Sequence, residues 1–135
     1  MDDRTRSTVR ALALGRIGIG VAALTFPGLV GRAWIGPVGS GRGVKALVRA
    51  LGIRDAVIGI GTLVTLDDDR PVSHWLWYGV AVDAVDAVAT VLAAGSIPKR
   101  ALVSVVAMAS AGAVSGVRLA QHVEAQSDDG FPETV

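Results

Sequence analysis

The chain has 135 residues, no cysteine, and an aromatic content of only 4%. Without cysteine, the protein has no disulfides, thiolate metal sites or cysteine nucleophiles. The formal net charge of +1 and the scarcity of aromatics give no support for a nucleic-acid-binding surface, so we expect no nucleic-acid partner. The histidines, His74 and His122, are far apart in sequence, and we therefore predict neither a metal site nor another cofactor.

Long charge-free segments are also missing. The longest are residues 101–117, with 17 residues, and 17–31, with 15, whereas an ordinary membrane-spanning helix needs about 18 or more. Yet 51% of the residues are hydrophobic, and the mean hydropathy is +0.52. Such a composition is unusual for a small water-soluble domain, which covers its surface with polar side chains. The hydropathy is that of a membrane protein, but the usual uninterrupted spans are absent.

The apolar residues fall into blocks separated by charged or Gly/Pro-rich breaks. Each block lasts about 20–25 residues, several times the length of a typical strand. We therefore predict an all-α fold, a four-helix transmembrane bundle with short loops in a single domain over 1–120. An acidic, disordered tail is expected at 121–135. The predicted spans are 9–30, 44–66, 72–97 and 101–120.

A polar stripe in the third block supports the helical prediction. Gly79, Asp83, Asp86 and Thr90 are spaced four, three and four residues apart, which places them on one helix face. The first block could instead be a secretory signal peptide. However, Arg16 divides its apolar run and no small-residue cleavage site precedes a polar domain, so we expect a retained helix.

The expected location is the cell membrane, with the lipid bilayer as the chain's surroundings. An even number of spans would place both termini on one side. Lys and Arg outside the spans divide evenly between the two sides, which leaves the orientation open. The preference for arginine over lysine is typical of a GC-rich bacterial gene.

Aromatic and small residues predict how the helices are placed. Aromatic side chains near the ends of spans are typical of membrane–water interfaces, although Tyr78 fits core packing equally well. Small residues along a helix let neighbouring backbones approach in lipid, here within the bundle or in a homodimer or larger membrane complex. The predicted interfacial aromatics are Trp34, Trp75, Trp77 and Tyr78, and the predicted packing residues are Ala107, Ala111, Gly112, Ser115 and Gly116.

Ionisable residues within the predicted spans are the most informative feature. A charge at the centre of a spanning helix costs about 2.5–3.5 kcal/mol on insertion scales, so such residues should face the bundle interior and pair. We predict that Arg54 meets Asp83 and Asp86, and that Asp55 meets Arg16. Arg49 could instead lie near a helix end and extend to the interface. The expected intramembrane network is Arg16, Arg49, Arg54, Asp55, Asp83 and Asp86, with three charges of each sign.

The segment Gly52-Ile53-Arg54-Asp55, followed by Gly59, Gly61 and the aspartates Asp83 and Asp86, resembles a family of small four-helix integral membrane proteins. That family has no established function and is found in actinobacteria and fungi. The similarity covers about residues 11–120, and its specific part is the Gly-Ile-Arg-Asp motif. The resemblance implies a four-span bundle and no particular activity.

Three functional hypotheses fit these residues. The leading one is a structural or accessory membrane component that is not an enzyme, has no catalytic residue, and uses the charges to fix helix register. A second is a small proton- or ion-coupled transporter acting as an oligomer, because buried Asp and Arg mark ion paths in membrane proteins. A third is a lipid-modifying enzyme in which Asp83 and Asp86 bind Mg²⁺.

Overall fold

The structure, a computed structural model, describes residues 1–68 and 71–128. This described part contains five α-helices and one short 3₁₀ helix, and no strand. The all-α prediction is confirmed. In chain order the elements are α1 (Asp3–Thr25), α2 (Pro27–Ile35), η1 (Pro37–Ser40), α3 (Arg42–Asp67), α4 (Ser73–Leu92) and α5 (Lys99–Asp128).

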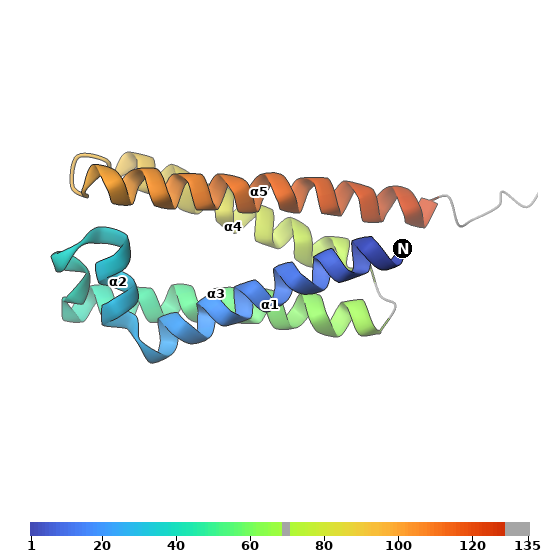
Figure 1. The fold of residues 1–135 in the computed structure, drawn as a ribbon, viewed down its shortest axis with the longest axis horizontal. Coiled ribbons are helices and arrows are strands. Elements are labelled where there is room, and N and C mark those ends of the chain that lie inside the picture. The colour runs from blue at the N-terminus through green and yellow to red at the C-terminus, as the bar shows by residue number, and fades with distance from the viewer. Residues whose placement is uncertain (69–70, 129–135) are drawn as a thin grey trace, which may run out of the picture.

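The four long helices form two antiparallel hairpins (Figure 1). In one hairpin α1 packs along α3, and in the other α4 packs along α5. The short elements α2 and η1 lie at the end where α1 connects to α3. The hairpins approach each other near the N-terminus of α1 and diverge toward the α2 end. Residues between the hairpins therefore determine how the halves of the molecule are held together.

An apolar core joins the hairpins at the end nearest the N-terminus. The core includes Val9 from α1 and Leu66 from the end of α3, both almost fully buried. Its remaining buried members come from the start of α4, the residue before it, and the last third of α5: Val72, Leu76, Ala120 and Val123. Because this core occupies one end only, the middle of the molecule needs other contacts between the hairpins.

Glycines allow α1 and α3 to pack with their backbones in contact. A Cβ atom added to Gly52 would lie 2.7 Å from the Cβ of Ala23 and 2.8 Å from the carbonyl oxygen of Gly20. A Cβ added to Gly20 would lie 2.6 Å from the carbonyl oxygen of Gly52. Small residues at such positions are the usual means of close helix packing in lipid. The glycine of the Gly-Ile-Arg-Asp segment therefore has a packing role.

The predicted first span, 9–30, is divided between two helices. Proline has no amide hydrogen to donate within a helix, and Pro27 accordingly ends α1 and occupies the first turn of α2. At the other end, Asp2 caps α1 by accepting a hydrogen bond of 2.8 Å from the amide of Thr5. That hydrogen bond, and a second from the side chain of Gln126, hold the pKa of Asp2 well below its usual value. The cap extends the helix back to Asp3.

The prediction of a disordered tail from residue 121 is wrong for Gln121–Asp128, which continue α5. Val123 packs in the core, and Glu124 accepts a hydrogen bond of 2.9 Å from the indole of Trp77. Gln126 donates to the carboxylate of Asp2 at 2.7 Å. These contacts with α4 and the start of α1 order the segment. The rest of the predicted tail, 129–135, lies outside the described residues.

The other predicted spans agree better with the structure. The second, 44–66, lies within α3, and the fourth, 101–120, lies within α5. The third, 72–97, extends beyond the end of α4 at Leu92, because residues 93–96 form turns before Pro98. Hydropathy thus predicts where the long helices lie, whereas their ends depend on local turns and caps.

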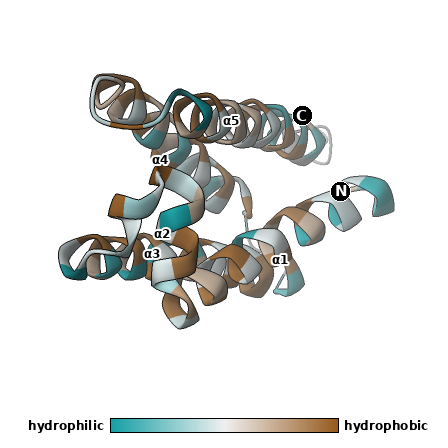
Figure 2. Ribbon diagram, turned by 60° about the vertical axis from the view of Figure 1, so that its left-hand side comes forward, coloured by the Kyte–Doolittle hydropathy of each residue, from teal (hydrophilic) through white to brown (hydrophobic). Residues whose placement is uncertain are grey.

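Among the described residues, three helices, α1, α4 and α5, are long and apolar enough to cross a membrane. Apolar residues recur along the helices of both hairpins (Figure 2). Many of them are exposed, for example Leu14 on α1, Val57 on α3, Val88 on α4 and Val103 on α5. At 26 residues α3 is also long enough to cross, but it carries Arg49, Arg54 and Asp55 along its length and is not among the three. The composition of the helices is thus that of a membrane protein.

Candidate functional site

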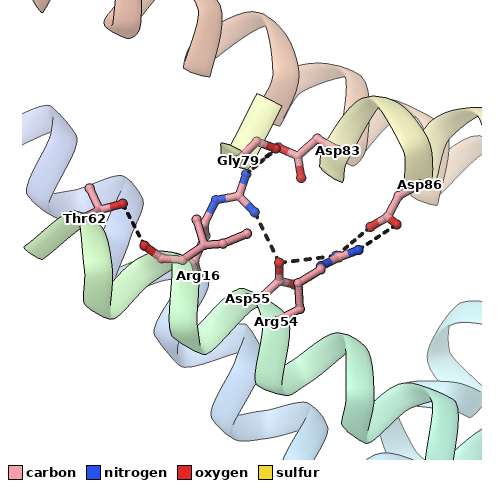
Figure 3. Close-up of polar contacts among 8 residues, drawn as sticks. Arg16, Arg54, Asp55, Thr62, Gly79, Asp83 and Asp86 are labelled. Atoms are coloured by element: carbon pink, nitrogen blue, oxygen red, sulfur yellow. Dashed lines mark hydrogen bonds and ion pairs between the residues drawn. The ribbon is translucent and has the colours of Figure 1, made fainter. Parts of the chain in front are cut away.

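Five charged side chains meet between the hairpins, near the middle of their helices (Figure 3). We call this set the charge cluster. From one hairpin, α1 contributes Arg16 and α3 contributes Arg54 and Asp55; from the other, α4 contributes Asp83 and Asp86. Two of its ion pairs, Arg16–Asp83 and Arg54–Asp86, cross from one hairpin to the other. The cluster lies farther toward the α2 end of the molecule than the apolar core does.

Arg16 connects three helices. Its Nη1 donates to Oδ1 of Asp55 at 3.2 Å, and its Nη2 donates to Oδ2 of Asp83 at 2.5 Å. Nη2 also lies 3.3 Å from the carbonyl oxygen of Gly79, to which it donates. A Cβ on Gly79 would come within 3.0 Å of the same Nη2. A glycine at this position of α4 therefore makes room for the guanidinium.

Arg54 makes the second connection between the hairpins. Its Nη1 and Nη2 donate to the two oxygens of Asp86 at 2.9 and 2.8 Å, a bidentate arrangement. Nη2 also donates to Oδ1 of Asp55 at 3.3 Å. Oδ1 of Asp55 thus accepts from both arginines, which links the five side chains into one chain of contacts. The Nε of Arg54 is buried and has no hydrogen-bond partner.

The structure confirms two of the predicted pairs and corrects a third. Arg16 does meet Asp55, and Arg54 does meet Asp86. The predicted pairing of Arg54 with Asp83 is wrong, because Asp83 contacts Arg16 instead. Asp83 and Asp86 are three residues apart, and this offset along α4 presents them to arginines on different helices.

The prediction that Arg49 belongs to the network is also wrong. Arg49 is exposed, and its Nε donates to the carbonyl oxygen of Leu24 at 3.4 Å, near the α2 end of α1. Five residues along a helix correspond to about 140° of rotation, which turns Arg49 away from the direction of Arg54. The cluster therefore contains two guanidinium groups and three carboxylates, a formal charge of 2 − 3 = −1 when all are ionised.

Burial separates the cluster into an inner and an outer part. The side chains of Arg16, Asp55 and Asp83 are only 12%, 13% and 13% exposed. Arg54 and Asp86 are 26% and 32% exposed, so the bidentate pair is the more accessible one. The stripe predicted from spacing is confirmed as inward-facing, because Gly79 contacts Arg16 and Thr90 lines the space beside Asp86.

A cavity of about 630 Å³ lies beside the cluster, between the hairpins at the end nearest α2. Residues from all five α-helices line it. Its walls are mainly apolar and include Trp34, Ile35, Leu47, Leu51 and Met108. Its charged lining consists of Arg16, Asp55, Asp83 and Asp86, and Arg54 is not among the lining residues. The cavity surface therefore presents three carboxylates and one guanidinium.

The small residues predicted on α5 divide into two rows. Gly112 and Gly116 face α4: a Cβ on Gly112 would collide with Oδ2 of Asp83, and one on Gly116 would lie 2.7 Å from Val80 Cγ2. This row has the predicted packing role within the bundle. The other row is exposed on the outer surface and consists of Ala107, Ala111 and Ser115.

The predicted interfacial aromatics have different surroundings. Trp75 packs where a Cβ on Gly61 would collide with its ring, and it meets Tyr78 edge-on with ring centres 5.8 Å apart. Trp77 is 38% exposed and bonds to α5. Trp34 is half-buried and lines the cavity. The sequence does not predict that Trp34 lines a cavity. It also does not predict that Gly79 leaves room for the side chain of Arg16, or Gly112 for that of Asp83.

The described residues contain no group of three or more His, Cys, Asp or Glu side chains suited to hold a metal ion. Oxygens of both Asp83 and Asp86 accept hydrogen bonds from guanidinium groups. His122 lies 3.6 Å from the carboxylate of Asp2, far along α5 from the cluster. The arrangement can hold two hairpins together and can present negative charge to the cavity.

Comparison with known proteins gives no match to a family model, to a curated protein or to a solved structure. The resemblance based on Gly52-Ile53-Arg54-Asp55 therefore stays a prediction.

A Gly112→Ala substitution tests how tightly the cluster is fitted to α5. The added methyl group would displace the Asp83 carboxylate from Arg16, and overpacking of this kind costs about 1–3 kcal/mol. We expect a lower thermal midpoint in detergent, measured by circular dichroism. Gly18→Ala is the matched control, because a Cβ there meets nothing within 4 Å. Equal midpoints for both variants would contradict the close fit.

Proposed function

We propose that the chain is a small multi-pass integral membrane protein of the cell membrane, with α1, α3, α4 and α5 all crossing the bilayer. The outward face of α3 supports its inclusion despite its charges. This face carries four apolar residues at helical spacing, each 51–55% exposed: Ile53, Val57, Ile60 and Val64. Arg54 and Asp55 instead point inward, where they contact Asp86 and Arg16. An apolar outer face with inward charges is the arrangement expected in lipid.

Within this membrane protein, the charge cluster has a structural role. The main observation behind this proposal is that the pairs Arg16–Asp83 and Arg54–Asp86 connect the hairpins near the middle of the helices, where the apolar core does not reach. In hydrocarbon an unpaired charge is expensive, so these pairs favour one relative position of the hairpins. We infer a structural or accessory component of the membrane. The exposed row of Ala107, Ala111 and Ser115 is available for a second copy or a larger complex.

The four-span arrangement is tested by labelling single cysteines, for which the cysteine-free chain needs no prior substitution. We expect Asp3→Cys and Asp68→Cys to react with an impermeant maleimide from one side of the membrane. Gly41→Cys and Ser96→Cys should react from the other. Labelling in intact and permeabilised cells distinguishes the sides. If α3 did not cross, Gly41→Cys and Asp68→Cys would share a side, which would contradict the proposal.

The enzyme hypothesis has the least support from the geometry. Mg²⁺ would have to compete with two guanidinium groups for Asp83 and Asp86. Mg²⁺-dependent thermal stabilisation of the purified protein by a lipid diphosphate would revive this hypothesis.

Two features favour transport as a second candidate function: the cavity, and the excess of one carboxylate over the guanidinium groups in the charge cluster. Intramembrane carboxylates mark ion and proton paths. The transport hypothesis predicts a proton or ion flux in proteoliposomes. An Asp86→Asn variant that accumulates normally but loses that flux would replace the structural role with transport.

A further inference from the structure

We propose that the cavity between the hairpins is a binding site for an amphipathic organic cation, a small molecule with an apolar body and one protonated amine. This site goes beyond the structural role of the cluster. The cavity of about 630 Å³ lies within the range of about 300–1,000 Å³ typical of small-molecule pockets. Its apolar walls and few grouped polar side chains also match such pockets.

The residues that line the cavity divide into an apolar group and a charged group. Trp34 and Ile35 from α2, with Leu47 from α3, line the end that α2 and η1 approach. The charged lining residues lie farther toward the middle of the long helices. A ligand that fills both parts has an apolar body and a polar group at one end.

The sign of the charged part determines the ligand class. Three carboxylates and one guanidinium line the cavity, and the whole cluster has a formal charge of −1. A positive group beside them would balance this charge, whereas an anion would add to it. A neutral apolar molecule, such as a lipid chain, would leave the charge unbalanced. The geometry therefore favours a monovalent cation with an apolar body.

Asp86 is the best-placed carboxylate to receive the amine. It is the most exposed member of the cluster, at 32%, and it lines the cavity. Each oxygen accepts one hydrogen bond from Arg54, and a carboxylate oxygen can accept two. An ammonium group can thus bond to Asp86 while the bidentate pair stays intact.

The test uses three probes that share one apolar body: N,N-dimethyl-4-phenylbutylamine, methyl 4-phenylbutyl ether and 4-phenylbutyrate. Binding to the full chain in nanodiscs is measured by calorimetry and by tryptophan fluorescence, to which Trp34 in the cavity wall contributes. We expect saturable binding of the amine at least about tenfold tighter than that of the ether, or about 1.4 kcal/mol. The carboxylate probe should bind most weakly. Equal affinities for amine and ether, or tightest binding of 4-phenylbutyrate, would overturn the proposal.

Two variants locate the site. Asp86→Asn makes the cluster formally neutral, and the amine should then bind no more tightly than the ether. Gly15→Leu places a side chain in the cavity without touching the charges, since Gly15 lines it and has open space at its Cβ. This variant should lose amine binding. Gly18→Leu, which also has open space but does not line the cavity, is the control and should bind normally.

The Gly15→Leu comparison decides the location even if Asp86→Asn fails to fold. Amine binding by Gly15→Leu with wild-type affinity would contradict the site. Failure of the probes to bind to a stably folded wild-type protein would reject the cation site alone. The structural role of the cluster is tested separately, by exchanging the two charges in an Arg54→Asp/Asp86→Arg variant.

Discussion

A Gly52→Leu variant is expected to lose most of its accumulation in the membrane fraction, whereas Gly18→Leu accumulates like the wild type. At Gly52 the helices touch, and even the first carbon of a side chain would lie 2.7 Å from the Cβ of Ala23 and 2.8 Å from the carbonyl oxygen of Gly20. A leucine would therefore force α1 and α3 apart along their whole contact. At Gly18 an added Cβ meets nothing within 4 Å.

The expected destabilisation by Gly52→Leu is about 3 kcal/mol or more, the upper end for overpacking, because backbone atoms cannot move aside as side chains do. A loss of this size lowers the amount of folded protein several-fold in cells. Quantitative immunoblots of membrane fractions, with thermal unfolding in detergent, measure the effect. If Gly52→Leu matched Gly18→Leu in both measurements, the close α1–α3 contact would be wrong.

Reversing one charge of the bidentate pair should have an effect of similar size. Arg54→Asp would place a new carboxylate beside Asp55 and Asp86, and it would change the formal charge of the cluster from −1 to −3. Breaking a fully buried ion pair costs about 3–5 kcal/mol. The Arg54–Asp86 pair is only partly buried, with side chains 26% and 32% exposed, but repulsion is added in a setting where unpaired charge is expensive. We expect at least about fivefold lower accumulation in the membrane fraction. Arg42→Asp, the same charge reversal at the exposed first residue of α3, is the control and should accumulate normally.

Much of the helical arrangement could be predicted because lipid-facing and interior residues follow a simple period. The stripe from Gly79 to Thr90 correctly gave the inward face of α4. The ion pairs Arg16–Asp55 and Arg54–Asp86 were also predictable, because charges within membrane-spanning helices are expensive unless they pair with the opposite sign. The assignment of Asp83 required the offset between α4 and the other hairpin, and sequence spacing within one helix contains no such information.

Other features depended on contacts between distant parts of the chain. Helix α5 continues past residue 120 because Val123 packs in the core and Gln126 donates a hydrogen bond to Asp2. The acidic sequence of the tail gives no indication of either contact. The apparent balance of three positive and three negative charges included Arg49, which bonds instead to the carbonyl of Leu24. Without Arg49, the cluster has three carboxylates and only two guanidinium groups. The cavity could not be predicted, since it results from the divergence of the hairpins.

The most direct test of the central claim, that ion pairs hold the hairpins together, is an exchange of the two charges. The measurement is the membrane accumulation and detergent stability of Arg54→Asp/Asp86→Arg, compared with each single variant and with the wild type. An ion pair between α3 and α4 would be restored with opposite polarity, so the double variant should recover most of what each single variant loses. Losses in the double variant equal to the sum of the single losses would contradict the claim.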